Sequence, residues 1–260
     1  MPTTNPLKMT LMKKIIFAIA CLLAVAQAGA VGLINKAEVI NVRLGYGIGG
    51  TAPIGLPPSI RSLNKFKLQF NPSLGIDATY GIKGPLGIMF GIQLENKGME
   101  MDARVKDYHM EIVHGGQQLA GQFTGDVTTK VTEWMITIPI QASYRYKKVR
   151  FKLGPYISYV GSRNFSGWAH NGYLRVGNPT GPKVFLGDSV EERGEYDFTG
   201  HMRRLQAGID AGIDWKWSSR FGGFLDLAWG LTPVHKSDFK TIEQTLYPIY
   251  GKIGVTYRLK

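Results

Sequence analysis

Residues 134–146 read WMITIPIQASYRY, and this stretch indicates the fold more clearly than any other part of the chain. Alternate positions from Trp134 to Tyr146 are apolar, whereas Glu133, Thr137 and Gln141 lie on the other face. Because successive side chains of a strand point to opposite faces, the stretch predicts a β-strand with two unlike faces. Globular strands average roughly five or six residues, and a tilted strand needs roughly 9–11 to cross a bilayer. The length therefore favours a membrane strand.

The same alternation recurs along the chain, and the connections are in turn short and long. The other alternating stretches are 40–49, 66–80, 86–95, 149–159, 204–217, 222–231 and 247–259. The long connections are 51–65, 97–129, 161–201 and 232–245. Outer-membrane barrels have short periplasmic turns and long external loops. We therefore predict an all-β, eight-stranded, antiparallel up-and-down transmembrane β-barrel with short periplasmic turns and four long extracellular loops.

Alternation alone does not say which face points outward, since a soluble lipocalin-like carrier alternates with its apolar face inward. Here the polar face combines many glycines with charged residues, which fits a hydrated, salt-bridged interior. Aromatic residues gather near both ends of the apolar face, as in the double aromatic girdle of a membrane barrel. They are Phe66, Trp134, Trp229 and Tyr247 at one rim, and Tyr80, Tyr144, Tyr146, Trp215 and Trp217 at the other. The prediction is therefore a membrane barrel, with the soluble carrier as an alternative.

The N-terminus has the features of a secretory signal peptide in residues 1–30. Met12 is followed by two lysines, an apolar core from Ile15 to Val25 and small residues, with cleavage expected after Ala28 or Ala30. Residues 31–260 then form a single barrel domain. The expected location is the outer membrane of a didermal bacterium. The net charge of +12 suits an anionic lipid surface or solvated loops, and no nucleic-acid partner is expected for an exported chain.

The polar faces supply the charges expected inside the barrel. An eight-stranded barrel is just wide enough for side chains to fill, so we predict a closed lumen with paired charges, because unpaired ones would be costly there. A gated ion path is the alternative. The basic candidates are Arg43, Lys67, Arg145, Arg150, Lys152, Arg204, Lys216, Lys252 and Arg258, and the acidic ones are Asp77, Glu95, Glu133, Asp210, Asp214 and Asp226.

Several segments, in their order and spacing, resemble the PorT-like outer-membrane β-barrel domain family. They are Glu95-Asn96-Lys97-Gly98-Met99, the stretch 134–139, Leu153-Gly154-Pro155-Tyr156-Ile157 and Trp229-Gly230-Leu231-Thr232. The resemblance implies a barrel fold and an outer-membrane address, and no catalytic residues. The chain ends in Tyr257-Arg258-Leu259-Lys260, whereas many such barrels end on an aromatic residue. Pro139 lies within an expected strand, so a bulge or a missing ladder bond is expected there.

No motif in the sequence predicts a catalytic, cofactor or metal site. The five histidines are His109, His114, His170, His201 and His235. They lie in or beside the long connections, and their spacing matches no metal-binding motif. We therefore expect a non-enzymatic, monomeric barrel that binds a partner or surface ligand through its long loops or serves a structural or accessory role, for instance in secretion. Its other partners would be membrane lipid, lipopolysaccharide and the barrel-assembly machinery. The alternative within the membrane is an enzyme acting on outer-leaflet lipid or peptide.

Overall fold

The computed structural model describes residues 37–53, 55, 57–239, 241–242 and 245–260, so the expected signal peptide lies outside the described residues. These residues form eleven strands and one short 3₁₀ helix, η1 (Thr199–His201). No helix in these ranges is both long and apolar enough to cross a bilayer. The strands are β1 (Val39–Pro53), β2 (Ile60–Lys67), β3 (Pro72–Lys83), β4 (Leu86–His114), β5 (Gln117–Tyr146), β6 (Val149–Val176), β7 (Lys183–Leu186), β8 (Gly194–Asp197), β9 (Leu205–Lys216), β10 (Phe221–Gly230) and β11 (Leu246–Arg258).

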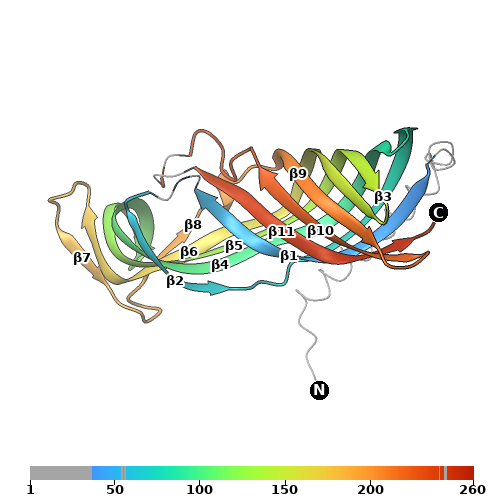
Figure 1. Cartoon of the computed structure of the whole chain (residues 1–260). Coiled ribbons are helices and arrows are strands. Elements are labelled where there is room, and N and C mark those ends of the chain that lie inside the picture. Colours follow the sequence, from blue (N-terminus) through green and yellow to red (C-terminus); the bar gives the residue numbers. More distant parts are fainter. Residues whose placement is uncertain (1–36, 54, 56, 240, 243–244) are drawn as a thin grey trace, which may run out of the picture.

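Antiparallel pairing carries the wall round a closed circuit (Figure 1). The order is β1, β3, β4, β5, β6, β9, β10 and β11, and β11 pairs again with β1. The circuit is uneven, since β10 has 10 residues and β5 has 30. The 11-stranded sheet also contains β2, which pairs with β4, as well as β7 and β8. The expected eight strands therefore correspond to the circuit alone, and the described residues contain three further strands, β2, β7 and β8.

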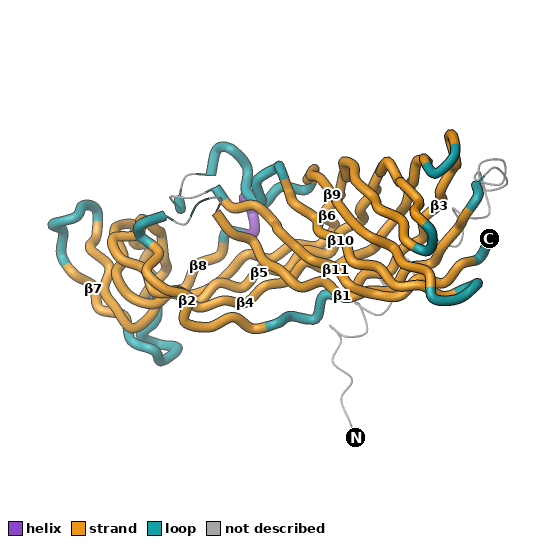
Figure 2. The backbone as a smooth tube through the Cα atoms, in the orientation of Figure 1, coloured by secondary structure: helices purple, strands orange, loops and turns teal. Residues whose placement is uncertain are grey.

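The prediction of four long loops is wrong in two places. Residues 97–129 are almost wholly strand, because β4 and β5 run on as one hairpin to the turn at Gly115 and Gly116. Residues 161–176 continue β6, and β7 and β8 lie in the remainder of that expected loop. Figure 2 shows these strands running beyond the end of β9, β10 and β11. We call this projecting part the extension: β4 after Lys97, β5 before Glu133 and β6 after Val160, together with β2, β7 and β8.

The hydrophobic pattern inverts where the wall passes into the extension. Along β4, the outward Phe90 is exposed and the inward Glu95 is buried. Eight or more residues further on, Ala103 and Val105 are buried while the intervening Arg104 is exposed. Lipid outside the wall accepts apolar side chains, whereas water outside the extension favours polar ones. The inversion therefore marks the end of the lipid-facing region.

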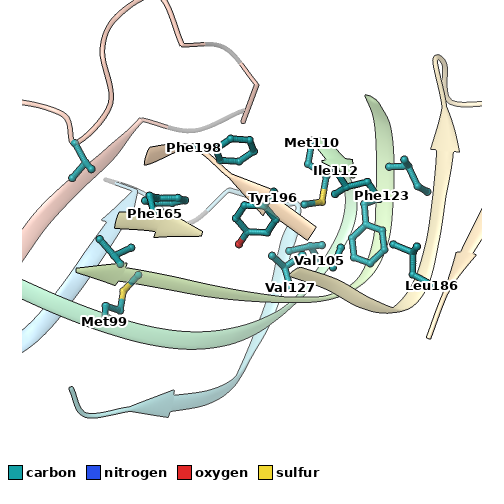
Figure 3. Packing of buried hydrophobic residues seen from close by; sticks show 14 of the residues in the cluster. Met99, Val105, Met110, Ile112, Phe123, Val127, Phe165, Leu186, Tyr196 and Phe198 are labelled. Carbon is teal, nitrogen blue, oxygen red and sulfur yellow. The ribbon is translucent and has the colours of Figure 1, made fainter. Parts of the chain in front are cut away.

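The main apolar core of the described residues lies in the extension (Figure 3). Phe123 of β5 and Leu174 of β6 are fully buried in it, and Phe165, Tyr196 and Phe198 extend it toward the wall. Tyr196 stacks on Phe198, with 5.0 Å between ring centroids. A buried core of this kind stabilises the extension as a folded unit in water.

The outer face of the wall is apolar, as expected for a membrane barrel. Leu153, Leu225 and Ile253 are all more than half exposed, at 59, 57 and 58%. This orientation is the reverse of a soluble carrier's, so the lipocalin-like alternative is wrong. Of the aromatic residues expected at the two rims, Tyr144, Tyr146, Trp215, Trp217 and Trp229 are exposed on the wall. The prediction for Phe66 is wrong, because it lies in β2 of the extension. At Pro139, β4–β5 pairing is missing between the Phe90–Ile140 and Gln93–Thr137 pairs, without a register shift.

Candidate functional site

The first charged cluster lies inside the wall near the short turns. Arg43 of β1 reaches three carboxylates, with distances of 3.2 Å to Asp77, 3.1 Å to Asp214 and 2.6 Å to Asp226. Lys152 of β6 lies 2.7 Å from Asp214 and 2.9 Å from Asp226. Five strands contribute these side chains, so the cluster joins opposite sides of the wall. The Arg43 guanidinium also lies 3.9 Å from the centroid of the Phe224 ring.

A second charged cluster lies further toward the extension. The Lys252 ammonium of β11 lies 3.2 Å from Glu95 and 3.5 Å from Asp210, and it donates a hydrogen bond to the Gln93 side chain. Lys97 lies 3.5 Å from Glu95 on its own strand. All of these side chains are almost completely buried. The cluster therefore pairs charges across the wall in the same way as the first.

A polar and aromatic layer separates the second cluster from the apolar core. Gln206 donates a 2.7 Å hydrogen bond to Glu133. The Lys97 ammonium lies 5.0 Å from the ring centroid of Tyr156 and 5.8 Å from that of Tyr250. Both tyrosines are almost fully buried. From the short turns to the extension, the interior thus changes from ion pairs through aromatic rings to apolar side chains.

The expected interior charges divide into three groups. Arg43, Lys152, Lys252 and all six acidic candidates lie in the interior as expected. Lys67 and Arg204 do not: Lys67 is exposed and pairs with Glu100 of β4. The remaining basic candidates lie at the mouth of the barrel, at the end with the short turns; they are Arg145, Arg150, Lys216 and Arg258.

Lys97 is an interior cation that the sequence analysis did not include among its candidates. It is the first residue of segment 97–129, which the sequence pattern assigned to a loop, and a loop position predicts no inward-facing side chain. The signal was present, because residues 93–97 keep the period-two pattern with Gln93, Glu95 and Lys97 on one face.

The mouth at the short-turn end is an open basic pocket of about 350 Å³. Its walls include the last residues of β5, β9 and β11 and the first residues of β6. Arg145 and Arg150 are directly opposite each other in the β5–β6 ladder. The Arg150 guanidinium donates a 3.1 Å hydrogen bond to the Thr79 hydroxyl.

The outer face of the extension carries a histidine between two carboxylates. His170 Nε2 lies 2.8 Å from Asp102, and His170 Nδ1 lies 3.1 Å from Asp188. Partial burial alone would raise the pKa of Asp102, but hydrogen bonds from Thr128, Asn64 and His170 hold that pKa below its usual value. The Thr128 hydroxyl is 3.2 Å from His170 Nε2, which Asp102 already occupies at a shorter distance. The arrangement is therefore a cross-strand polar contact rather than a nucleophile activated by a free base.

Two other histidines come together where the expected long connections pack over the barrel. His201 and His235 lie against the Phe239 ring, with centroid distances of 4.8 and 4.6 Å. Burial, with a smaller contribution from His201, lowers the pKa of His235 to about 4. Within the described ranges, no three His, Cys, Asp or Glu side chains are grouped so as to hold a metal ion.

Comparisons with known proteins give one family match and several structural matches. Residues 35–236 match the family described as outer membrane protein beta-barrel domain. No curated protein matches the chain. Among solved structures, the attachment invasion locus protein Ail of Yersinia pestis, in complex with the heparin analogue sucrose octasulfate, is 9% identical. The match has a TM-score of 0.38 and covers 85% of this chain and 99% of that one.

A second solved structure is the translocator domain of the autotransporter NalP from Neisseria meningitidis. It is 11% identical with a TM-score of 0.22, and the match covers 95% of this chain and 96% of that one. The family match spans most of the chain and includes every strand of the antiparallel wall except β11. The chain therefore belongs to the outer membrane protein beta-barrel domain family and is a protein of the outer membrane of Gram-negative bacteria.

Proposed function

We propose that this chain is a non-enzymatic, monomeric outer-membrane barrel with a closed lumen. Its extension stands outside the cell and binds a partner or surface ligand. The observation that carries the proposal is the inversion of the hydrophobic pattern along β4. Because the extension buries its own apolar core and presents polar residues outward, it is built to stand in water beyond the membrane. The short turns and the C-terminus would then face the periplasm.

The two charged clusters support a closed lumen. Arg43 and Lys252 each contact carboxylates from more than one other strand. A water-filled pore would need these charges to line a free path, whereas here they bridge opposite strands and are buried. We therefore favour a packed interior over the gated ion path. Conductance of purified protein in planar bilayers tests this: only rare, small currents are expected, and a large steady current would contradict it.

The β6–β7 hairpin offers the most suitable recognition surface on the extension. Phe185 is 72% exposed and packs edge to face with Tyr173, with 6.2 Å between ring centroids. The Lys183 ammonium lies 4.2 Å from the Tyr173 ring centroid. Exposed aromatic rings beside cations are typical of the residues that dominate binding energy at interfaces. A partner would therefore gain most from contacting these three side chains.

Cysteine labelling tests the proposed orientation directly. The only natural cysteine is Cys21, in the segment expected to be removed. We expect Val190→Cys, in the extension, to react with a membrane-impermeant maleimide on intact cells. Lys148→Cys, in a short turn, should react only after the outer membrane is permeabilised. The reverse pattern would contradict the orientation.

Site-specific photocrosslinking tests the binding role. A photoreactive residue at position 185 should give a discrete adduct on intact cells, and Tyr173→Ala should remove it. The same residue at position 106, on exposed Lys106 of β4, is the matched control and should give none. An adduct that persists in Tyr173→Ala, or equal adducts at both positions, would contradict recognition by the β6–β7 hairpin.

The proposal also covers export, membrane insertion and the position of the chain within its family. Residues 1–30 would act as the signal peptide and 31–260 as the mature domain, inserted by the barrel-assembly machinery and in contact with lipopolysaccharide. The segments quoted above favour a PorT-like member of the family. A lipid- or peptide-modifying enzyme is less favoured, because the Thr128 hydroxyl beside His170 donates its 2.7 Å hydrogen bond to Asp102 and lies 3.2 Å from the histidine.

A further inference from the structure

The basic mouth at the short-turn end has an excess of positive charge that the fold leaves uncompensated. Arg145, Arg150, Lys216 and Arg258 are on the inward-facing positions of four different strands. The adjoining turns add the remaining cations of the pocket, which are Lys147, Lys148 and Arg220. The pocket is therefore surrounded by cations on several sides rather than bordered by one basic strand.

Acidic residues do not balance these cations. Among the described residues, the only acidic side chain within 4 Å of any of them is Glu38, at 3.9 Å from Arg145, and Arg258 Nε lies 2.6 Å from the main-chain oxygen of the last residue, Lys260. Asp214 also borders the pocket, but it is already paired with Arg43 and Lys152 in the first charged cluster. Residues 1–36 contain no Asp or Glu, so the N-terminal segment has no side chain that could neutralise the pocket.

The strand register makes the like charges close neighbours. Arg145 and Arg150 are a directly opposed pair in the β5–β6 ladder, and like charges in this position are destabilising. Arg150 donates a hydrogen bond to the neutral Thr79 hydroxyl, and Arg258 donates hydrogen bonds to the main-chain oxygens of Lys260 and Glu38. A bound anion would relieve this repulsion and accept further hydrogen bonds from the guanidinium groups.

We propose that the basic mouth is a binding site for a phosphate group. The pocket volume of about 350 Å³ admits a phosphate group with part of the molecule that bears it. Guanidinium groups match phosphate oxygens in a bidentate arrangement. A phosphate monoester also carries more negative charge than a carboxylate, at about −1.5 to −2 near neutral pH, whereas the phosphodiester of a phospholipid headgroup carries about one and matches the guanidinium groups by geometry alone. The excess of cations therefore favours phosphate.

Two sources could present this group, and one experiment separates them. The first is a soluble phosphorylated compound, and the second is the headgroup of an anionic phospholipid beside the barrel rim. The second source rests on the proposed orientation, because phospholipid must then form the leaflet at the short-turn end. Binding to protein in detergent does not depend on orientation, and the labelling of Lys148→Cys tests orientation separately.

The test compares two variants of equal net charge. The mouth variant is Arg150→Gln with Lys216→Gln, and the control variant is Lys106→Gln with Lys65→Gln, two exposed lysines of the extension. Equilibrium dialysis with radiolabelled inorganic pyrophosphate measures the soluble source. Native mass spectrometry of protein released from nanodiscs counts retained phosphatidylglycerol against phosphatidylcholine and measures the lipid source. A heat-modifiability gel confirms that both variants are folded.

The proposal expects binding of at least one probe to weaken tenfold or more in the mouth variant and to remain within about twofold of wild type in the control. Loss of pyrophosphate binding would identify a soluble phosphate site, and loss of selective phosphatidylglycerol retention would identify a lipid site. Equal binding by both variants, or binding of neither probe by the wild-type protein, would overturn the proposal.

Discussion

Replacing Arg43 with methionine tests whether the interior charges form a dry, paired network. Arg43 lies within 3.2 Å of Asp77 and closer to Asp214 and Asp226. Its removal leaves Lys152 alone with three carboxylates. Two like charges 4 Å apart repel by about 4 kcal/mol at an effective dielectric constant near 20. Removing one partner of a buried pair costs about 3–5 kcal/mol, and we expect Arg43→Met to lower the free energy of unfolding by that amount.

Equilibrium unfolding in urea, with the barrel in lipid vesicles and tryptophan fluorescence as the signal, measures this loss. Arg145→Met is the matched control, because its side chain is 52% exposed and its only carboxylate partner lies 3.9 Å away. An exposed pair of this kind contributes about 0–1 kcal/mol. Adding Asp226→Asn to Arg43→Met should restore part of the lost stability, since it removes one unpaired carboxylate.

A small effect of Arg43→Met would show that the interior charges are not a dry, paired network. If the free energy of unfolding of Arg43→Met lies within about 1 kcal/mol of the wild-type value, as that of the control should, the clusters are hydrated and the lumen contains water. The conductance measurement proposed above would then be expected to show open channels. Agreement between the two assays therefore decides between a packed interior and a wet one.

Three further predictions concern the wall, the extension and its pH dependence. Gly154→Ala should prevent insertion or strongly destabilise the wall, because its Cβ would lie 2.1 Å from the Ile140 carbonyl oxygen. Gly161→Ala should be tolerated, because the nearest atom to its Cβ would be 3.9 Å away. Heat-modifiability gels compare the two variants. Phe123→Ala should lower the free energy of unfolding of the extension by about 3–5 kcal/mol. Hydrogen exchange should then become faster in the extension and stay unchanged in the wall. Burial lowers the pKa of His235 from 6.5 to about 4, so the folded protein binds this proton less readily than the unfolded chain does. The free energy of unfolding should therefore be highest above pH 6.5 and should fall by on the order of 3 kcal/mol as the pH drops to about 4. In His235→Phe, thermal unfolding should lose this part of the pH dependence, and an unchanged profile would contradict the assignment.

The sequence by itself determined the wall and its orientation. The period-two pattern in 134–146 and its counterparts identified the strands of the circuit, because strand geometry forces alternate side chains to opposite faces. It also identified the central charges Arg43, Lys152 and Lys252, since each shares the inward face of its strand with a glycine two positions later. The same reasoning failed at 97–129, where alternation continues with the opposite polarity. Lipid and water select opposite faces, and only knowledge of where the membrane ends shows which face is inside.

Tertiary structure alone decided how the charges divide. Sequence assigns Arg145, Arg150, Lys216 and Arg258 to the inward face, just as it assigns Arg43. Their depth along the barrel depends on the register of strands that are far apart in sequence. That depth decides whether a carboxylate from another strand lies within reach. Pairing of Arg43 with Asp226, 183 positions away, and the clustering of cations at the mouth both follow from that register. Long-range register is set by closure of the whole wall, which no local pattern contains.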